Sequence, residues 1–266
     1  MPSAGRLRYL DAAPSGSVRS RGTLVLLHAF PLNARMWEPQ LALAEHGWRV
    51  LAPHYRGMDG GAADPPATSV DDYTADVIDL VDILKIEEAV FCGLSLGGYV
   101  AFSLFRLAPR YVRGLVLADT RSQADTPEAV EGRKRLLAVA REQGPGAVAD
   151  EMVPKLLGET TRREHPAIAE RVRSLILSSS SPAIEGAITA LMTRPDSTAT
   201  LSSIHCPTLI IVGDEDTLTP PSMSRDMLRA IGGAELAVIP KAGHLSSLET
   251  PAAFNAALAR FLEHRI

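Results

Sequence analysis

The chain has 266 residues, of which 46% are hydrophobic and 22% are charged, and its formal net charge at pH 7 is −4. A chain of this size can bury a large core, so it needs no disulfide or structural metal in order to fold. Its 27 Lys and Arg residues are dispersed along the sequence, which argues against a surface for nucleic acid or for an anionic membrane.

The N-terminal stretch and the two cysteines bear on the compartment. The N-terminus has no apolar run of the length found in signal peptides, and no window approaches the roughly 18 apolar residues that a membrane span needs. Cys92 and Cys206 lie in or beside apolar, strand-like segments, as buried free thiols do in a reducing compartment. We therefore expect a cytoplasmic protein.

Six short apolar runs predict β-strands. They lie at residues 23–28, 48–53, 89–93, 114–119, 208–213 and 235–240. Because each run is continuous rather than alternating, the strands should be buried on both faces, as in a parallel sheet covered by helices. Residues 71–85 predict an amphipathic helix between two of these strands. Strands that alternate with helices indicate the α/β class.

Residues 121–200 interrupt this alternation, because they contain helical patterns and no strand-like run. The expected organisation is a core of residues 1–120 and 201–266 with an all-helical cap of residues 121–200. The cap has no Phe, Tyr or Trp, and its charges balance, so we expect it to turn an aliphatic surface toward any ligand. The candidates for that surface are Met152, Leu156, Leu157, Leu175, Ile176, Leu191 and Met192.

Ser95 lies in the segment GLSLG at 93–97, which matches the pattern G-x-S-x-G. An apolar strand leads directly into the motif, and an apolar helix follows it. A strand-to-helix turn this tight forces strained backbone angles at the serine, and small residues two positions before and after it avoid clashes. The serine hydroxyl then stands clear of the sheet, as a nucleophile requires.

A serine nucleophile needs a histidine base and a carboxylate that orients the histidine. His244 follows the last predicted strand, and Asp214 and Asp216 follow the strand before it. Asp119, at the end of an earlier strand, is a third candidate for the acid. Since parallel strands end at one edge of their sheet, these side chains should approach Ser95 there.

Acyl transfer also needs two N–H donors for the anionic tetrahedral intermediate. The N–H of Leu96, directly after the serine, is one candidate. The other donor should come from the loop after an early strand, where residues 28–31 lie, and the Phe30 N–H is our candidate. We expect His28 in this loop to brace it by hydrogen bonding rather than to act as a base.

These segments together resemble the α/β-hydrolase superfamily over nearly the whole chain. The matching pieces are H-A-F-P at 28–31, G-L-S-L-G-G at 93–98, G-D-E-D-T-L-T-P at 213–220 and A-G-H-L-S-S-L-E-T-P at 242–251. Within the superfamily, the chain looks most like the branch of 3-oxoadipate enol-lactonases and perhydrolase-like esterases. The resemblance implies an α/β fold with a mostly parallel central sheet flanked by helices and an all-helical cap inserted after the sixth strand.

The resemblance also implies a site. Its residues would be Ser95, Asp216 and His244 as catalytic triad, with Phe30 and Leu96 as oxyanion hole. Asp216 fits the family's spacing G-x-x-D-x-x-x-P. The chain departs from the family at Ala29, where relatives usually have Gly and where a negative φ would tolerate the change, and in the turn at 54–59.

The expected activity is that of a serine hydrolase that cleaves small, largely apolar carboxylic esters or lactones through an acyl-enzyme on Ser95. A dehalogenase or an epoxide hydrolase of this fold would need an aspartate in place of the serine. An enol-lactonase-like lactonase takes an anion, so a cap cation such as Lys155 or Arg121 should then face the pocket. A perhydrolase and a non-catalytic ligand receptor are further alternatives.

The partner that we expect is therefore a small-molecule ester or lactone, with no nucleic acid and no membrane, and a homodimer is compatible with the sequence. We expect no cofactor. His54 and Asp59 have no third residue at metal-ligand spacing, so we expect no metal site either.

Overall fold

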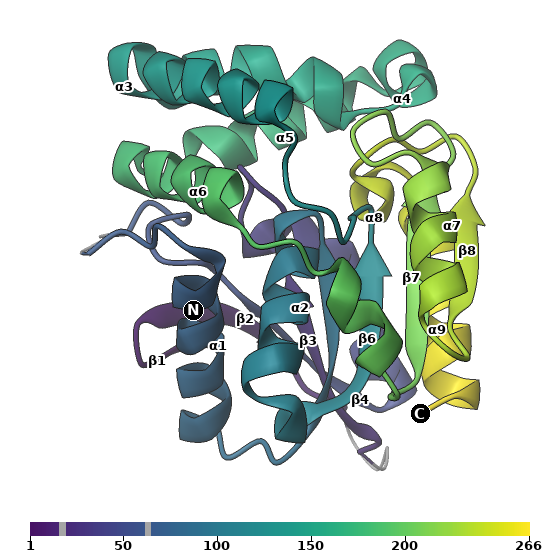
Figure 1. The fold of residues 1–266 in the computed structure, drawn as a ribbon. Helices are drawn as coiled ribbons and strands as arrows, with labels where there is room; N and C mark the ends of the chain where they lie inside the picture. The colour runs from purple at the N-terminus through teal and green to yellow at the C-terminus, as the bar shows by residue number, and fades with distance from the viewer. Residues whose placement is uncertain (16–19, 62–64) are drawn as a thin grey trace.

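The predicted strands form most of one eight-stranded sheet (Figure 1). The computed structural model describes residues 1–15, 20–61 and 65–266. The strands are β1 (Ser3–Ala4), β2 (Leu7–Ala12), β3 (Gly22–Leu27), β4 (Trp48–Pro53), β5 (Ala89–Leu94), β6 (Val112–Ala118), β7 (Thr208–Gly213) and β8 (Glu235–Ile239). Their order is β1-β2-β4-β3-β5-β6-β7-β8, with β2 antiparallel to β1 and β4 and the other neighbours parallel.

Strands β3 to β8 match the six predicted runs to within two residues at either end. The sequence does not predict β1 and β2, because β2 carries charged residues on its exposed positions and lacks a continuous apolar run. Strands β5 and β7 are buried along their whole length, as expected, and β5 contains the buried free thiol of Cys92. Cys206, just before β7, is also free and is half-buried.

The expectation of burial on both faces is wrong for β8. This strand forms the edge of the sheet, and its residues are mostly half-buried. Val238 is 43% exposed although it lies in an apolar run. Position in the sheet, which follows from tertiary pairing, therefore decides the burial of this run.

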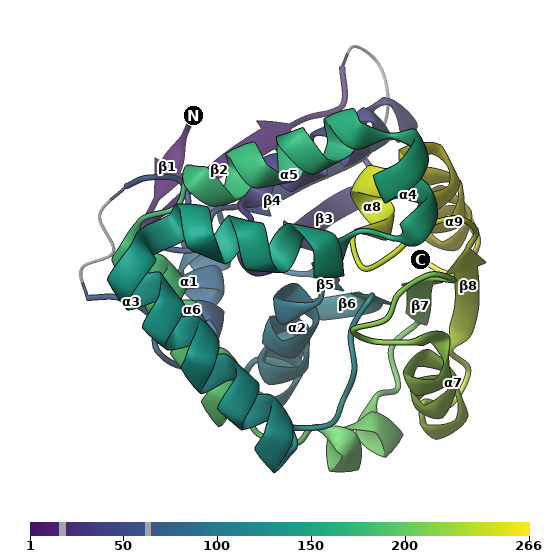
Figure 2. The same ribbon diagram turned by 90° about the horizontal axis from the view of Figure 1, so that it is seen from above.

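Helices cover both faces of the sheet (Figures 1 and 2). One face carries α1 (Val70–Ile83), α2 (Leu96–Leu107) and α7 (Pro221–Ala230), and the other carries a 3-10 helical segment (Ala34–His46) and α9 (Pro251–His264). The predicted helix 71–85 corresponds to α1. It begins where Ser69 and Asp72 each accept a hydrogen bond from the other's backbone N–H, a reciprocal cap that satisfies two free donors.

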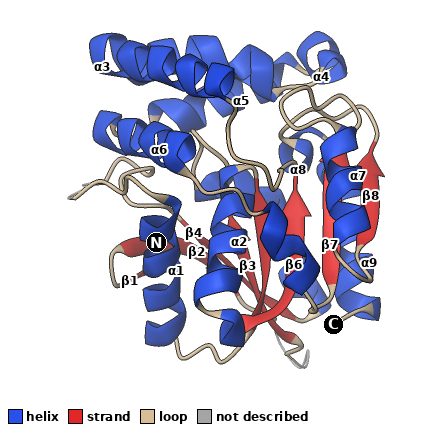
Figure 3. Cartoon of the chain, in the orientation of Figure 1, coloured by secondary structure: helices blue, strands red, loops and turns tan. Residues whose placement is uncertain are grey.

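After β6 the chain leaves the sheet and forms four α-helices and a short 3-10 helix (Thr198–Ser203), and residues 120–207 contain no strand (Figure 3). The α-helices are α3 (Pro127–Leu156), α4 (Glu159–Glu164), α5 (Pro166–Leu177) and α6 (Ser181–Thr193). They lie above the ends of the strands toward which the arrows of β6 and β7 point. Gly144, with φ 77° and ψ −170°, interrupts α3, so that this element consists of two helical pieces joined at a kink.

Within the described ranges, no single helix is both long and apolar enough to cross a membrane. Only α5 and α6 taken together meet the length and composition of a span, and the two helices are bent by 100° relative to each other.

Candidate active site

Ser95 occupies the turn between β5 and α2, with φ 55° and ψ −112°. The strained angles that the motif predicts are therefore present. A Cβ on Gly93 would lie 2.1 Å from the carbonyl oxygen of Gly97, and a Cβ on Gly97 would lie 2.0 Å from that of Leu27. Only glycine fits at these two positions, because the chain must turn between the strand and the helix with no room for a side chain.

The structure brings Ser95, His244 and Asp216 together at the carboxyl edge of the sheet. The Nε2 atom of His244 lies 2.8 Å from the Oγ of Ser95, and its Nδ1 lies 2.8 Å from the Oδ2 of Asp216. A carboxylate can only accept, so Nδ1–H donates to Asp216 and Nε2 is left to accept from the serine hydroxyl. Thr219 also donates its hydroxyl to Oδ2 of Asp216, at 2.6 Å, which holds the carboxylate in place.

The charges of His244 and Asp216 stabilise each other. Burial disfavours the imidazolium, but the Asp216 carboxylate outweighs it and raises the pKa of His244, with smaller contributions from Asp119 and Glu249. Burial likewise opposes ionisation of Asp216, yet the charge and the hydrogen bond of His244 lower the pKa of that carboxyl to about 2. The pair is thus arranged to hold an ionised acid beside a histidine that readily takes up a proton.

The other two candidate acids lie elsewhere. Asp119 is fully buried, and its carboxyl group accepts hydrogen bonds from the Gly213 N–H, at 2.8 Å, and from the hydroxyl of Ser246. Burial, followed by the charge of Asp216, raises the pKa of Asp119 well above its usual range. Asp214 is exposed. Among the described residues, Asp216 is thus the carboxylate hydrogen-bonded to His244.

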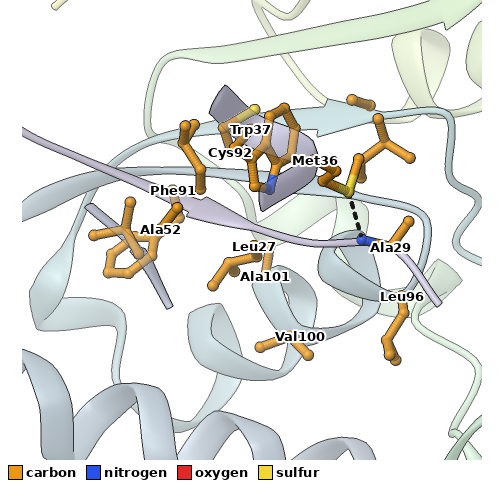
Figure 4. Packing of buried hydrophobic residues seen from close by; sticks show 14 of the residues in the cluster. Leu27, Ala29, Met36, Trp37, Ala52, Phe91, Cys92, Leu96, Val100 and Ala101 are labelled. Carbon is orange, nitrogen blue, oxygen red and sulfur yellow. Dashed lines mark hydrogen bonds between the residues drawn. The ribbon is translucent and has the colours of Figure 1, made fainter. Parts of the chain in front are cut away.

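Phe30 and Leu96 both lie beside Ser95, and Phe30 lines the same cavity as the serine. Within the described part of the chain, neither N–H donates to a backbone carbonyl outside regular elements. The described non-glycine residues with positive φ do not include Ala29, so the departure from the family glycine leaves an ordinary backbone there. Figure 4 shows the Ala29 N–H directed at the sulfur of Met36, and the two atoms lie 3.3 Å apart.

His28 braces this loop, as predicted. Its Nδ1–H donates to the carbonyl of Ala29, and its Nε2 accepts from the N–H of Tyr55, each at 3.0 Å. Complete burial lowers the pKa of His28 to about 3, so the ring is neutral and can accept that bond. The histidine therefore links the loop at Phe30 to the turn at 54–59, where the sequence departs from the family.

A cavity of about 330 Å³ opens above Ser95 between the core and the helices α3 and α6. Three of the predicted aliphatic cap residues line it, namely Met152, Leu156 and Leu191. The remaining four do not, and Leu157, Leu175 and Ile176 among them are buried. A larger hollow, of about 830 Å³, lies at the opposite, amino-terminal edge of the sheet and includes no member of the triad.

The expectation of a purely aliphatic cap surface is wrong. Charged cap residues also line the cavity, namely Arg121, Arg133, Arg135, Lys155, Asp125 and Glu151. Equal numbers of acidic and basic residues in a segment do not show which of them face inward. One pattern in the sequence could have predicted which side of this helix faces the cavity. The small residues Ala129 and Gly132 lie on the same helical face as Leu136 and leave room for a cavity at that face.

Asp125 organises three arginines at this wall. It pairs with Arg121, with Arg133 at 3.0 Å and with Arg194 at 2.7 Å. Burial opposes its ionisation, but the guanidinium groups of Arg194 and Arg133 lower the pKa of Asp125 to about 2. Arg194 also lies over the ring of Tyr99, 4.3 Å from its centre, so the wall combines an aromatic face with excess positive charge.

Comparison with known proteins gives relatives over almost the whole chain. The family model described as "Alpha/beta hydrolase family" matches residues 24–257. The 3-oxoadipate enol-lactonase 2 of Acinetobacter baylyi is 27% identical over 238 residues, which cover 90% of this chain and 87% of that protein.

Two solved structures are also similar. A thermophilic esterase from Thermogutta terrifontis, solved with malate bound, has a TM-score of 0.90 and 36% identity, covering 97% of this chain and 93% of that one. The enol-lactonase from Burkholderia xenovorans LB400 has a TM-score of 0.87 and 27% identity, with 97% and 96% coverage.

Proposed function

Since the chain belongs to the alpha/beta hydrolase family, we propose that it is a serine hydrolase that cleaves small carboxylic esters or lactones. The observation that carries the proposal is the continuous hydrogen-bonded line from Ser95 through His244 to Asp216, with 2.8 Å at each step. In this proposal residues 121–200 act as a cap over a core formed by residues 1–120 and 201–266.

The proposed reaction has two halves. His244 Nε2 takes the hydroxyl proton of Ser95 while the serine oxygen bonds to the substrate carbonyl carbon. The histidine then gives this proton to the departing alcohol oxygen, which leaves an acyl-enzyme. In the second half His244 takes a proton from water while the water oxygen bonds to the acyl carbon. The bond between the serine oxygen and the acyl carbon then breaks as His244 returns the proton to that oxygen, and the carboxylic acid is released. Asp216 stays ionised and stabilises the imidazolium in both halves.

The Phe30 and Leu96 N–H groups are proposed to hold the carbonyl oxygen as it becomes negative. Donors placed in advance stabilise the transition state more than the neutral ester, because the charge develops only there. The cavity volume of about 330 Å³ favours a small acyl group.

Hydrolysis of p-nitrophenyl acetate and butyrate tests the proposal. Wild-type protein should release nitrophenolate, and Ser95→Ala should lose about 10⁴-fold or more of kcat. Ser178→Ala, at the end of α5 and outside the cavity, is the matched serine control and should retain the activity. Equal background rates for wild type and Ser95→Ala would refute the proposal and favour a non-catalytic receptor.

A lactonase for substrates that carry a carboxylate is the second candidate. Four basic residues line the cavity against two acidic ones, and both candidates for the cation that this activity requires, Lys155 and Arg121, are among them. The enol-lactonase names of the relatives agree with this candidate.

Paired substrates separate the two candidates. Mono-p-nitrophenyl glutarate and p-nitrophenyl valerate differ chiefly in a terminal carboxylate. If the cations bind it, kcat/KM should favour the glutarate ester, and Arg121→Met or Lys155→Met should remove about 10-fold or more of that preference. Arg162→Met, an exposed cap substitution outside the cavity, is the control. If the wild type instead prefers the valerate ester, the carboxylate-binding lactonase is rejected and an esterase for neutral substrates remains.

A further inference from the structure

Glu249 holds the backbone on both sides of His244. Its Oε1 accepts hydrogen bonds from the N–H of Gly243, at 3.0 Å, and of Leu245, at 3.1 Å. These are the residues directly before and after the histidine. Glu249 ends the short helix α8 (Ser246–Glu249), so its side chain turns back over the loop from which the helix begins.

The second oxygen of the same carboxyl group reaches the cap. Its Oε2 accepts from the N–H of Gly158, at 2.8 Å, between α3 and α4. The partners that the structure describes for this group are thus three backbone N–H groups, and Glu249 is only 5% exposed. A buried carboxyl bonded only to donors suits a carboxylate, which has no hydrogen to give.

The cap and the histidine loop also touch directly. The N–H of His244 donates to the carbonyl of Leu156, at 3.1 Å. A Cβ on Gly243 would lie 2.2 Å from the nitrogen of Gly158, and a Cβ on Gly158 would lie 2.8 Å from the nitrogen of Gly243. Leu156 itself lines the cavity. The chain segment that closes the cavity therefore packs, backbone to backbone, against the loop that presents the histidine.

We propose that Glu249 is a positioning residue that locks the His244 loop onto the cap at Gly158, so that the cap sets the place of the imidazole relative to Ser95. The proposal rests on the proposed hydrolase function. It assigns the cap a part in forming the catalytic arrangement, in addition to closing the cavity. Glu249 acts through the loop and does not touch the reacting atoms.

Glu249 also adds negative charge near the imidazole. Three acidic groups act on the charge of His244 from different elements: Asp216 after β7, Asp119 after β6 and Glu249 in α8. The cavity that His244 lines is also lined by charged residues, namely Arg121, Asp125, Arg133, Arg135, Glu151 and Lys155. Glu249 contributes to the raised pKa of His244, although less than Asp216. Removal of this charge should therefore lower the pKa of His244. Loss of an ordinary helix cap would leave the pKa of His244 unchanged.

Glu249→Gln is the first test, because an amide has one acceptor instead of two. Whichever way it turns, its NH₂ group faces at least one of the three N–H donors. We expect kcat for p-nitrophenyl acetate to fall about 10-fold or more, since small displacements of a general base are costly. The midpoint of the acid limb of kcat/KM should move down by about half a pH unit.

Glu215→Gln is the matched control. Glu215 is also a core carboxylate bonded to the cap, through the N–H of Thr160 at 2.8 Å and its hydroxyl, but it does not bond the residues that flank His244. In Glu215→Gln the midpoint of the acid limb of kcat/KM should stay at the wild-type value. If Glu249→Gln and Glu215→Gln change kcat and the midpoint equally, the carboxyl of Glu249 is an ordinary structural contact and the proposal fails.

Glu249→Asp covers the case in which the glutamine variant does not fold. It keeps the charge but is one methylene shorter, so kcat should fall while the midpoint stays. An unchanged kcat in a folded Glu249→Asp would overturn the proposal.

The imidazole titration of His244 can be followed by NMR without any substrate, with the resonance assigned by its absence in His244→Gln. A midpoint in Glu249→Gln that is lower than in wild type supports the proposal, and an unchanged midpoint contradicts it. This measurement stands even if the protein hydrolyses no ester, so failure of the inference and failure of the proposed function are distinguishable.

Discussion

Asp216→Asn removes the charge that the structure places against His244. The pKa of Asp216 falls from its usual 3.8 to about 2. At about 1.4 kcal/mol per unit, this environment favours the carboxylate by about 2 to 3 kcal/mol, which is on the order of 100-fold in rate if it is lost in the transition state. An asparagine amide can also donate to Nδ1 of His244, which would place the ring hydrogen on Nε2 and remove the base. The combined loss should approach about 10⁴-fold in kcat.

The assay compares kcat for p-nitrophenyl acetate in three variants whose folding is checked by urea denaturation. Asp119→Asn should lose less than about 10-fold, because Asp119 bonds Gly213 and Ser246 rather than His244. Asp214→Asn should behave like wild type, since Asp214 is exposed. An inactive Asp119→Asn together with an active Asp216→Asn would refute the assignment of the acid.

Three further results are expected. Gly97→Ala should destabilise the fold by about 3 kcal/mol or more in urea denaturation, since its Cβ would lie 2.0 Å from the carbonyl of Leu27, and near-wild-type stability would contradict this packing. Because the pKa of His244 is raised, its ring stays protonated, and inactive as a base, to higher pH than an ordinary histidine. The acid limb of kcat/KM should therefore have its midpoint above pH 6.5, and a midpoint below 6.5 would contradict the raised pKa. Arg56→Met should cost about 3–5 kcal/mol, because it strands the buried carboxylate of Asp76, and Asp76→Asn with Arg56→Met should recover part of the loss.

Sequence alone predicts the features that depend on local pattern. Continuous apolar runs give β3 to β7, and the glycines around Ser95 give the strained turn. The meeting of Ser95, Asp216 and His244 also follows from the sequence, because strands that run parallel must present their loops at one edge. Each of these predictions needs only the direction of the chain and the identity of nearby residues.

Features that depend on residues far apart in the chain cannot be predicted from local sequence patterns. The pairing of β2 with β4 brings Tyr9 against Pro53 although β3 and a 3-10 helical segment lie between the two strands in the chain, and no short apolar run predicts this pairing. Asp125 pairs with Arg121 and Arg133, which are near it in the chain, and also with Arg194, which lies 69 residues away at the end of α6. A count of charges in the cap is the same whether these side chains face the cavity or the solvent.

The two halves of the candidate site are held in place by different parts of the chain. Ser95 is fixed by steric exclusion within the core, since Gly93 and Gly97 leave its turn no other path. His244 lies instead in a loop that the segment at Leu156 and Gly158 holds. The His244 N–H donates to Leu156, the Gly158 N–H donates to Glu249, and Gly158 packs directly against Gly243. Changes in the cap should therefore alter the turnover rate through His244 as well as the choice of substrate through the cavity, while the position of Ser95 stays the same.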